Sequence, residues 1–150
     1  MTASVLVDTN ILVYAYDRSE YDKQQRAVTV LDELASNGLG ILSTQVLAEF
    51  FVTVTRKIVV PLSVAEARIR IDHYLHAWTI INVTGMVIME ATRGVQDYQL
   101  SFWDAQIWAT ARLHQIPVVF SEDFNVGASL EGVRFINPLV SDFRLANWMS

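Results

Sequence analysis

Short apolar runs alternate along the chain with longer segments in which apolar residues recur every three or four positions. The short runs predict buried strands, and the longer segments predict helices that bury one face. We therefore expect strands at 4–7, 40–42, 79–83, 118–120 and 133–136. We expect helices at 10–16, 22–36, 44–56, 64–75, 86–99 and 102–114.

Residues at the helix boundaries support several of these limits. Asn37 and Gly38 are suited to end the helix at 22–36, and Ser63 and Ser101 are suited to cap the helices that follow them. Strands separated by helices indicate an α/β fold with a mainly parallel sheet covered on both faces. In such sheets the binding crevice lies beyond the carboxyl ends of the strands, so functional side chains are expected just after each strand.

Composition narrows the class of protein. The 150 residues suit a single domain at 1–150, and 52% hydrophobic against 18% charged residues exclude extensive disorder. The absence of cysteine excludes disulfides and thiolate metal sites. No stretch reaches the roughly 18 apolar residues that a membrane span needs, and the first residues lack the basic region of a secretory signal. We therefore expect a cytoplasmic protein with no membrane association.

The net charge of −5 argues against a large basic surface for nucleic acid. It is compatible with clustered carboxylates that a divalent cation neutralises. Asp8 directly follows the first expected strand, where it can either join such a cluster or cap the next helix. Glu49 falls at the margin of the apolar stripe of its helix, where a solvated side chain is the simpler interpretation of the residue alone.

Two further acids occur later in the chain. Asp104 and Ser101 together form a pattern close to a capping box, so Asp104 can serve a helix end or a site. Asp123 follows the strand at 118–120, where aspartate is also an ordinary turn former. The helix that carries Asp104 is expected to be deeply packed because of its large apolar side chains, Phe102, Trp103, Ile107 and Trp108.

Taken together, these four acids predict one site. Two follow strands and two lie on helices beside the sheet, so their like charges would repel and raise one another's pKa. A hard divalent cation relieves such repulsion, and Mg²⁺ and Mn²⁺ prefer oxygen ligands.

The segments VLVDTNIL, QVLAEF, LSFWDAQIWATA and VVFSED, in this order, resemble the motif set of the PIN-domain family, and the likeness extends to RFINPL. Within the family, the chain is most similar to VapC-like toxins of toxin–antitoxin pairs. The resemblance implies a three-layer α/β/α sandwich and hydrolysis of RNA with Mg²⁺ or Mn²⁺. It implies metal-ligating and catalytic roles for Asp8, Glu49, Asp104 and Asp123, with Asn10 and Ser121 as polar helpers.

In the expected mechanism, Asp8, Asp104 and Asp123 are the main ligands, and Glu49 holds a ligand water or helps to deprotonate the nucleophile. The resemblance also suggests a homodimer and an antitoxin partner. Two sets of side chains have open interpretations. Apolar residues on two helices can line a groove for a partner or face the core: Val30, Leu34, Ile69 and Leu75. Residues after the first motif can contact RNA, although a solvated helix face is the simpler interpretation of the cations and packing that of the tyrosines: Arg18, Lys23, Arg26, Tyr14, Tyr16 and Tyr21.

Two alternatives compete with a toxin ribonuclease. One is a non-catalytic interaction module of PIN-like fold, although four intact acids argue against it. The other is a PIN nuclease outside any toxin–antitoxin system. An aspartyl-phosphate enzyme is disfavoured because the run Asp8-Thr9-Asn10 lacks the second aspartate of a phosphatase nucleophile motif.

Overall fold

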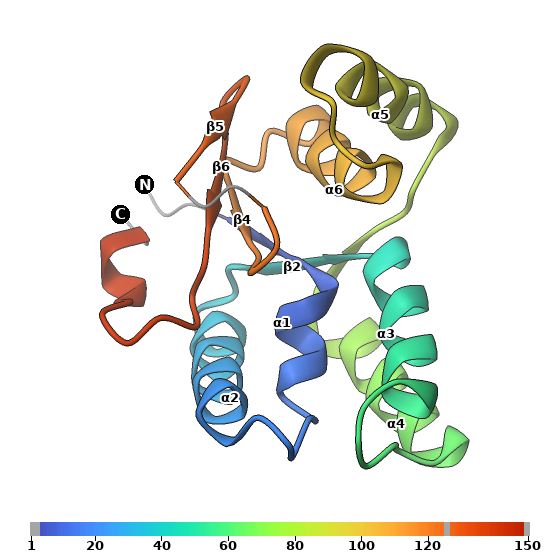
Figure 1. Cartoon of the computed structure of the whole chain (residues 1–150), viewed down its shortest axis with the longest axis vertical. Coiled ribbons are helices and arrows are strands. Elements are labelled where there is room, and N and C mark those ends of the chain that lie inside the picture. The colour runs from blue at the N-terminus through green and yellow to red at the C-terminus, as the bar shows by residue number, and fades with distance from the viewer. Residues whose placement is uncertain (1–3, 125–126, 149–150) are drawn as a thin grey trace.

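A six-stranded sheet runs through the middle of the molecule, with helices on both faces (Figure 1). The structure is a computed structural model that describes residues 4–124 and 127–148. The spatial strand order is β3-β2-β1-β4-β6-β5, and only the β5–β6 pair is antiparallel. The strands are β1 (Val5–Val7), β2 (Gly40–Ser43), β3 (Thr79–Ile81), β4 (Val118–Phe120), β5 (Ser129–Leu130) and β6 (Val133–Ile136).

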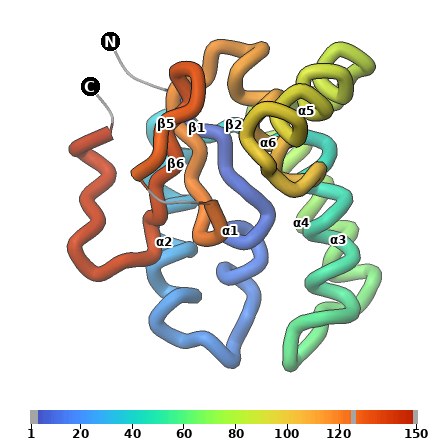
Figure 2. Tube along the Cα trace, turned by 45° about the horizontal axis from the view of Figure 1, so that its top comes forward, coloured from blue at the N-terminus to red at the C-terminus, as the bar shows by residue number. Residues whose placement is uncertain are grey.

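The connections between strands place the helices in two layers. From β1 the chain steps outward through β2 to β3, whereas β4 lies on the other side of β1. Parallel crossovers are right-handed, so the helices before β3 cover one face, and α5 and α6 cover the other (Figures 1 and 2). The helices are α1 (Thr9–Tyr14), α2 (Tyr21–Asn37), α3 (Thr44–Arg56), α4 (Val64–Ala77), α5 (Gly85–Tyr98) and α6 (Phe102–Leu113).

This architecture confirms the expected α/β/α sandwich with a mainly parallel sheet. Strand β1 is buried along its whole length, as expected for a central strand covered on both faces. Helix α2 ends at Asn37, and Gly38 follows in the left-handed conformation at φ 66°. The serines Ser63 and Ser101 cap α4 and α6, each accepting a hydrogen bond from the third backbone amide of its helix.

Several expectations need correction. Strand β5 and the 3-10 helix η1 (Leu145–Trp148) were not predicted from the pattern. Val30 and Leu34 are buried in the core, although Val30 also lines a hollow between α2 and the C-terminal segment, whereas Ile69 and Leu75 on α4 are exposed. In α6, Ile107 and Trp108 are buried as expected, but Trp103 is 60% exposed.

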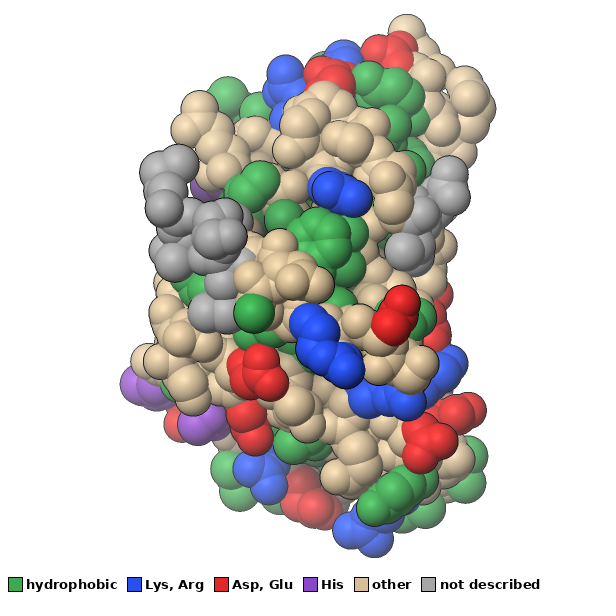
Figure 3. All heavy atoms as spheres, turned by 90° about the vertical axis from the view of Figure 1, so that its left-hand side faces the viewer, with side chains coloured by type: hydrophobic (Ala, Val, Ile, Leu, Met, Phe, Trp, Pro, Cys, Tyr) green, Lys and Arg blue, Asp and Glu red, His purple; other side chains and the backbone are tan. Residues whose placement is uncertain are grey.

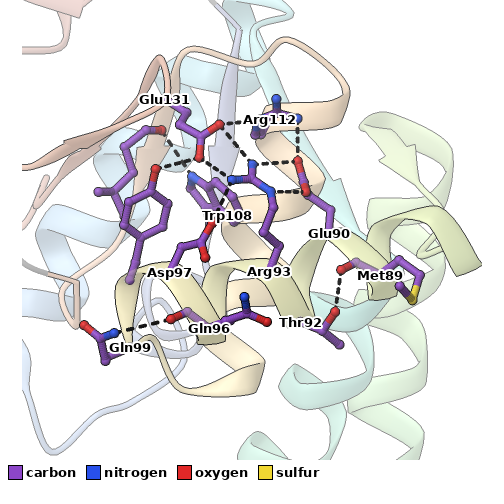
Figure 4. Close-up of polar contacts among 12 residues, drawn as sticks. Met89, Glu90, Thr92, Arg93, Gln96, Asp97, Gln99, Trp108, Arg112 and Glu131 are labelled. Atoms are coloured by element: carbon purple, nitrogen blue, oxygen red, sulfur yellow. Dashed lines mark hydrogen bonds and ion pairs between the residues drawn. The ribbon is translucent and has the colours of Figure 1, made fainter.

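An ion-pair network joins the layer of α5 and α6 to the turn between β5 and β6 (Figure 4). Arg93 contacts Glu90 on its own helix and Glu131 in the turn, and Arg112 of α6 contacts the same two acids. Arg93 also lies 5.3 Å from the ring centroid of the buried Trp108. Individual ion pairs at this exposure contribute little, but shared partners hold the three elements in one arrangement.

None of the helices within residues 4–124 and 127–148 combines the length and the apolar character needed to cross a bilayer.

Candidate active site

The carboxyl ends of β1 and β4 meet at the point where the direction of strand addition reverses. Val7 pairs with Phe120, and the amide of Asp8 donates to the Phe120 carbonyl at 2.9 Å. The residues that follow the two strands are therefore brought side by side. In open α/β sheets this reversal opens a crevice, which makes it the natural place for a site.

Asp8 lies at the base of this crevice and is only 6% exposed. One carboxylate oxygen accepts from the Thr9 amide at 2.7 Å, and the other accepts from Ser121 Oγ at 2.7 Å. Asp8 occupies the N-cap position of α1, so its capping role and its place among the acids coexist. Its pKa is raised to about 6: burial raises it most, the two hydrogen bonds lower it, and the charges of Asp104 and Glu49 raise it.

Asn10 and Ser121 connect the acids to the loop after β4. Asn10 Nδ2 donates to Asp123 Oδ2 at 2.8 Å, and its Oδ1 accepts from the Glu122 amide at 3.3 Å. Ser121 Oγ accepts from the Asp123 amide at 3.1 Å while it donates to Asp8. Both side chains therefore hold carboxylates in place, which is the arrangement expected of the polar helpers.

Glu49 reaches the crevice from α3. Its Oε1 accepts from Thr9 Oγ1 at 3.0 Å and from Gln45 Nε2 at 3.1 Å. Its other carboxylate oxygen has no hydrogen-bond partner within the part of the chain that the structure describes. Gln45 is anchored in turn by Gln106 Nε2, which donates to Gln45 Oε1 at 2.8 Å.

Asp104 reaches the crevice from the first turn of α6. Ser101 Oγ accepts from the Asp104 amide, but no reciprocal bond from the Ser101 amide to the carboxylate occurs among the described residues. A complete capping box is formed at α4, by Ser63 and Glu66. Partial burial raises the pKa of Asp104, Ser101 lowers it, and the charge of Asp123 raises it. Capping of α6 therefore uses the backbone amide of Asp104 and does not form a full capping box.

The structure thus brings the four acids together: the charges of Asp104 and Glu49 act on Asp8, and the charge of Asp123 acts on Asp104. The sequence-based reasoning missed Thr9, Gln45 and Gln106. Gln45 precedes Glu49 by one helical turn, and this spacing is the signal that could have identified it. Two cations that the sequence suggested for RNA contact have other partners. Lys23 forms an ion pair with Glu122, and Arg26 donates a hydrogen bond to the Leu139 carbonyl.

The donor set fits a hard divalent cation by its chemistry. It consists of carboxylates, and no basic side chain is among the main causes that shift the pKa of Asp8 or Asp104. Uncompensated negative charge in a partly buried crevice favours a bound cation. Within the described residues, however, no three Asp, Glu, His or Cys side chains are close enough to form a finished ligand set.

The face of the molecule shown in Figure 3 has no basic patch that would indicate a nucleic-acid interface. Lysine and arginine side chains are interspersed there with acidic ones and form no continuous basic patch. The large hollow between α2 and the C-terminal segment, about 630 Å³, also lies apart from the acids.

Comparisons with known proteins agree with this geometry. A family model described as the PIN domain matches residues 5–127. Among solved structures, a toxin–antitoxin complex from Klebsiella pneumoniae is 24% identical with a TM-score of 0.66, covering 90% of this chain and 98% of that one. VapC20 of Mycobacterium tuberculosis, a toxin that cleaves the sarcin–ricin loop, is 18% identical with a TM-score of 0.63, covering 85% and 98%. VapBC2 from Rickettsia felis, bound to promoter DNA, is 17% identical with a TM-score of 0.64, covering 89% and 97%. No curated protein sequence matches.

Proposed function

The chain belongs to the PIN-domain family, and on this premise we propose that it is a metal-dependent endoribonuclease with Asp8, Glu49, Asp104 and Asp123 as its active site. The observation that carries the proposal is the buried Asp8 at the reversal point of the sheet, with two further acids raising its pKa. A fold has no need of such repulsion, which is accepted where it serves function. The proposed catalytic unit is the single domain at 1–150.

Each acid has a distinct proposed role. Asp8, Asp104 and Asp123 hold Mg²⁺ or Mn²⁺, because their carboxylates face one crevice from three different elements. When bound, the cation supplies Lewis-acid stabilisation of the phosphate and lowers the pKa of a ligand water. Glu49 orients the attacking water and accepts its proton through the oxygen that is free of Thr9 and Gln45. Asn10 and Ser121 hold the carboxylates of Asp123 and Asp8 in position through hydrogen bonds.

The test is cleavage of single-stranded and structured RNA with Mg²⁺ or Mn²⁺, with and without EDTA. We expect EDTA to abolish cleavage and Asp8→Asn to reduce it by ~10²–10³ or more. Asp72→Asn is the matched control, because Asp72 is an exposed acid on α4, outside the site. Full activity in excess EDTA contradicts metal dependence, and full activity of Asp8→Asn contradicts the site assignment.

We further propose that the protein is the toxin of a toxin–antitoxin pair, acts in the cytoplasm and forms a homodimer. The similarity to toxin–antitoxin complexes supports the antitoxin partner, and exposed apolar side chains on α4, Ile69 and Leu75, support protein contacts. Co-expression with the product of the adjacent gene, followed by purification and light scattering, tests this. A monomer without a recovered partner would leave a PIN nuclease outside any toxin–antitoxin system.

A non-catalytic interaction module of the same fold remains the second candidate. It predicts that Asp8→Asn changes neither RNA turnover nor the response of stability to Mg²⁺. The RNA-cleavage assay and its EDTA arm therefore separate the two functions directly.

A further inference from the structure

A hollow of about 510 Å³ opens beside Glu49, between α3 and the first turn of α6. The start of α3 and the first turn of α6 approach each other here, and Gln45 Nε2 joins them by donating to the Trp103 carbonyl at 3.1 Å. Apolar and polar side chains share the lining. The lining includes Thr44, Gln45, Glu49, Val52, Lys57 and Trp103.

A second hollow, of about 390 Å³, lies beside Asp123. It is lined by Asn10 and Asp123, and it shares Thr53 and Lys57 with the first hollow. The two hollows are therefore parts of one path. Glu49 lines one part and Asp123 the other, so a strand whose phosphate lies at the acids extends into both.

Trp103 gives the first hollow its distinctive chemistry. Its indole is 60% exposed, although its neighbours Ala105, Gln106 and Ile107 in the same helix are buried. Its described aromatic contact is with Phe102, whose ring meets it edge-on at 5.1 Å between centroids. Trp103 lines the same hollow as Glu49, so the indole lies near one of the acids. An exposed indole face is a platform on which an unpaired base can stack.

Lys57 adds a positive charge where the two hollows meet. It is exposed at the C-terminal end of α3 and takes part in no ion pair among the described residues. Lys23, by contrast, is paired with Glu122 at 2.6 Å. A free ammonium beside a path of negative carboxylates is suited to meet a backbone phosphate that flanks the scissile one.

We propose that Trp103 and Lys57 form a nucleotide-binding subsite, in which an unpaired RNA base next to the cleaved bond stacks on Trp103 and its phosphate contacts Lys57. The inference rests on the proposed ribonuclease function and adds that the substrate is unpaired at this position. The occupant is a nucleotide and not a protein segment for two reasons. Glu49 lines the hollow, and the Thr44 hydroxyl, which accepts from the Val83 amide, can still donate to a base edge.

Binding of a short fluorescent single-stranded RNA to the Asp8→Asn protein in EDTA tests the subsite without cleavage. We expect Trp103→Ala to weaken binding roughly 5- to 150-fold and Trp103→Phe to retain most of the affinity. Tyr21→Ala is the matched control, because Tyr21 is a 69% exposed aromatic outside both hollows. An RNA that lacks the stacked base should bind weakly to the Asp8→Asn protein, and adding Trp103→Ala should weaken that binding no further.

Lys57→Gln should lower the slope of log affinity against log salt by about 0.7, the value for one phosphate contact on a single strand. Lys57→Arg should preserve the slope, and so should Arg68→Gln, which removes an exposed cation on α4. Equal binding by Trp103→Ala and Tyr21→Ala overturns the subsite and is the result expected if a protein covers the indole. Cleavage by the native protein is measured separately. Cleavage without dependence on Trp103 rejects the subsite alone, whereas Trp103-dependent binding without cleavage rejects the ribonuclease function alone.

Discussion

At the scale of single residues, Asp8 serves two purposes with opposite electrostatic demands. As the N-cap of α1 it is stabilised in its charged form by the Thr9 amide and by Ser121. As a buried acid near Asp104 and Glu49, its charged form is disfavoured. The second effect is larger, because the net result is a pKa raised to about 6. The ionised Asp8 carboxylate therefore destabilises the metal-free folded protein.

This balance predicts how stability of the metal-free protein depends on pH. The folded state holds the Asp8 proton up to about pH 6, whereas the unfolded state releases it near 3.8. Between these values the folded state binds more protons, so its stability falls as pH rises. The loss should be on the order of 2–3 kcal/mol between pH 4 and pH 7. Urea denaturation in EDTA at a series of pH values measures it.

The control for this prediction is Asp8→Asn, which cannot ionise. The pKa of Glu131 is lowered from 4.5 to about 2, chiefly by Arg93, so its stabilisation begins to fall below about pH 5, but it does so in both proteins alike. Subtracting the mutant profile from the wild-type profile isolates Asp8. If the two profiles run parallel from pH 4 to pH 7, the raised pKa of Asp8 is wrong.

A second residue-scale prediction concerns Asp104. If it only serves the helix end, Asp104→Asn lowers stability by about 0.3–1 kcal/mol. If it crowds Asp123 and Asp8, neutralising it relieves repulsion, and the metal-free protein becomes more stable. We expect the second result, together with a smaller stabilisation of the mutant by Mg²⁺, since the cation binds only the folded site. Thermal melting of both proteins in EDTA and in Mg²⁺ measures both effects. A less stable mutant with an unchanged response to Mg²⁺ would identify Asp104 as a cap.

The sequence was informative about the acids and less so about their neighbours. Asp8 and Asp123 were predictable because each follows a strand, and the sheet then fixes their proximity. Asn10 and Ser121 were predictable through the family resemblance. Gln45 and Gln106 were not, because an amide in a helix carries no mark of its partner, and their bond joins residues 61 positions apart. Such contacts depend on how α3 and α6 pack.

At the scale of elements, strong periodicity and capping signals located each of the long helices. The pattern failed where these signals were weak. Strand β5 has only two residues, and its turn to β6 uses Glu131 at φ 50° before Gly132 at φ 86°. A Glu-Gly turn lacks the Asn or Asp that usually marks such a hairpin. Trp103 was misjudged because hydrophobicity alone cannot distinguish a core side chain from a binding surface.

The contact between α5 and α6 gives an element-scale prediction. A Cβ added at Gly94 would lie 3.0 Å from the ring of Trp108, whereas one added at Gly85 would meet nothing within 4 Å. Trp108 is fully buried and donates to the Leu130 carbonyl, so it cannot easily move. We expect Gly94→Ala to be less stable than Gly85→Ala by about 1 kcal/mol or more, because overpacking outweighs the gain in helix propensity. Chemical denaturation of the two variants measures the difference, and equal stability would show that the two helices can separate freely.

At the scale of the whole molecule, one sheet connects everything that the site needs. Strands β1 and β4 carry Asp8 and Asp123, while helices from opposite faces, α3 and α6, deliver Glu49 and Asp104. The acids converge only if both helical layers are docked on the sheet. The site should therefore form in the same step as the fold, and a variant that loosens either layer should weaken metal binding as well as stability.

This dependence predicts that the chain unfolds as one cooperative unit. The protein has buried tryptophans in both layers, Trp78 beside β2 and Trp108 in α6, so its fluorescence reports on both. Melting curves from fluorescence and from far-ultraviolet circular dichroism should coincide. The calorimetric enthalpy should equal the van't Hoff enthalpy, at roughly 100 kcal/mol for 150 residues near 60 °C. Gly94→Ala should shift both curves equally. In a Trp78→Phe protein, where Trp108 is the buried reporter, a fluorescence change that precedes the loss of helix would show that α5 and α6 melt separately, and the single-domain prediction would then be wrong.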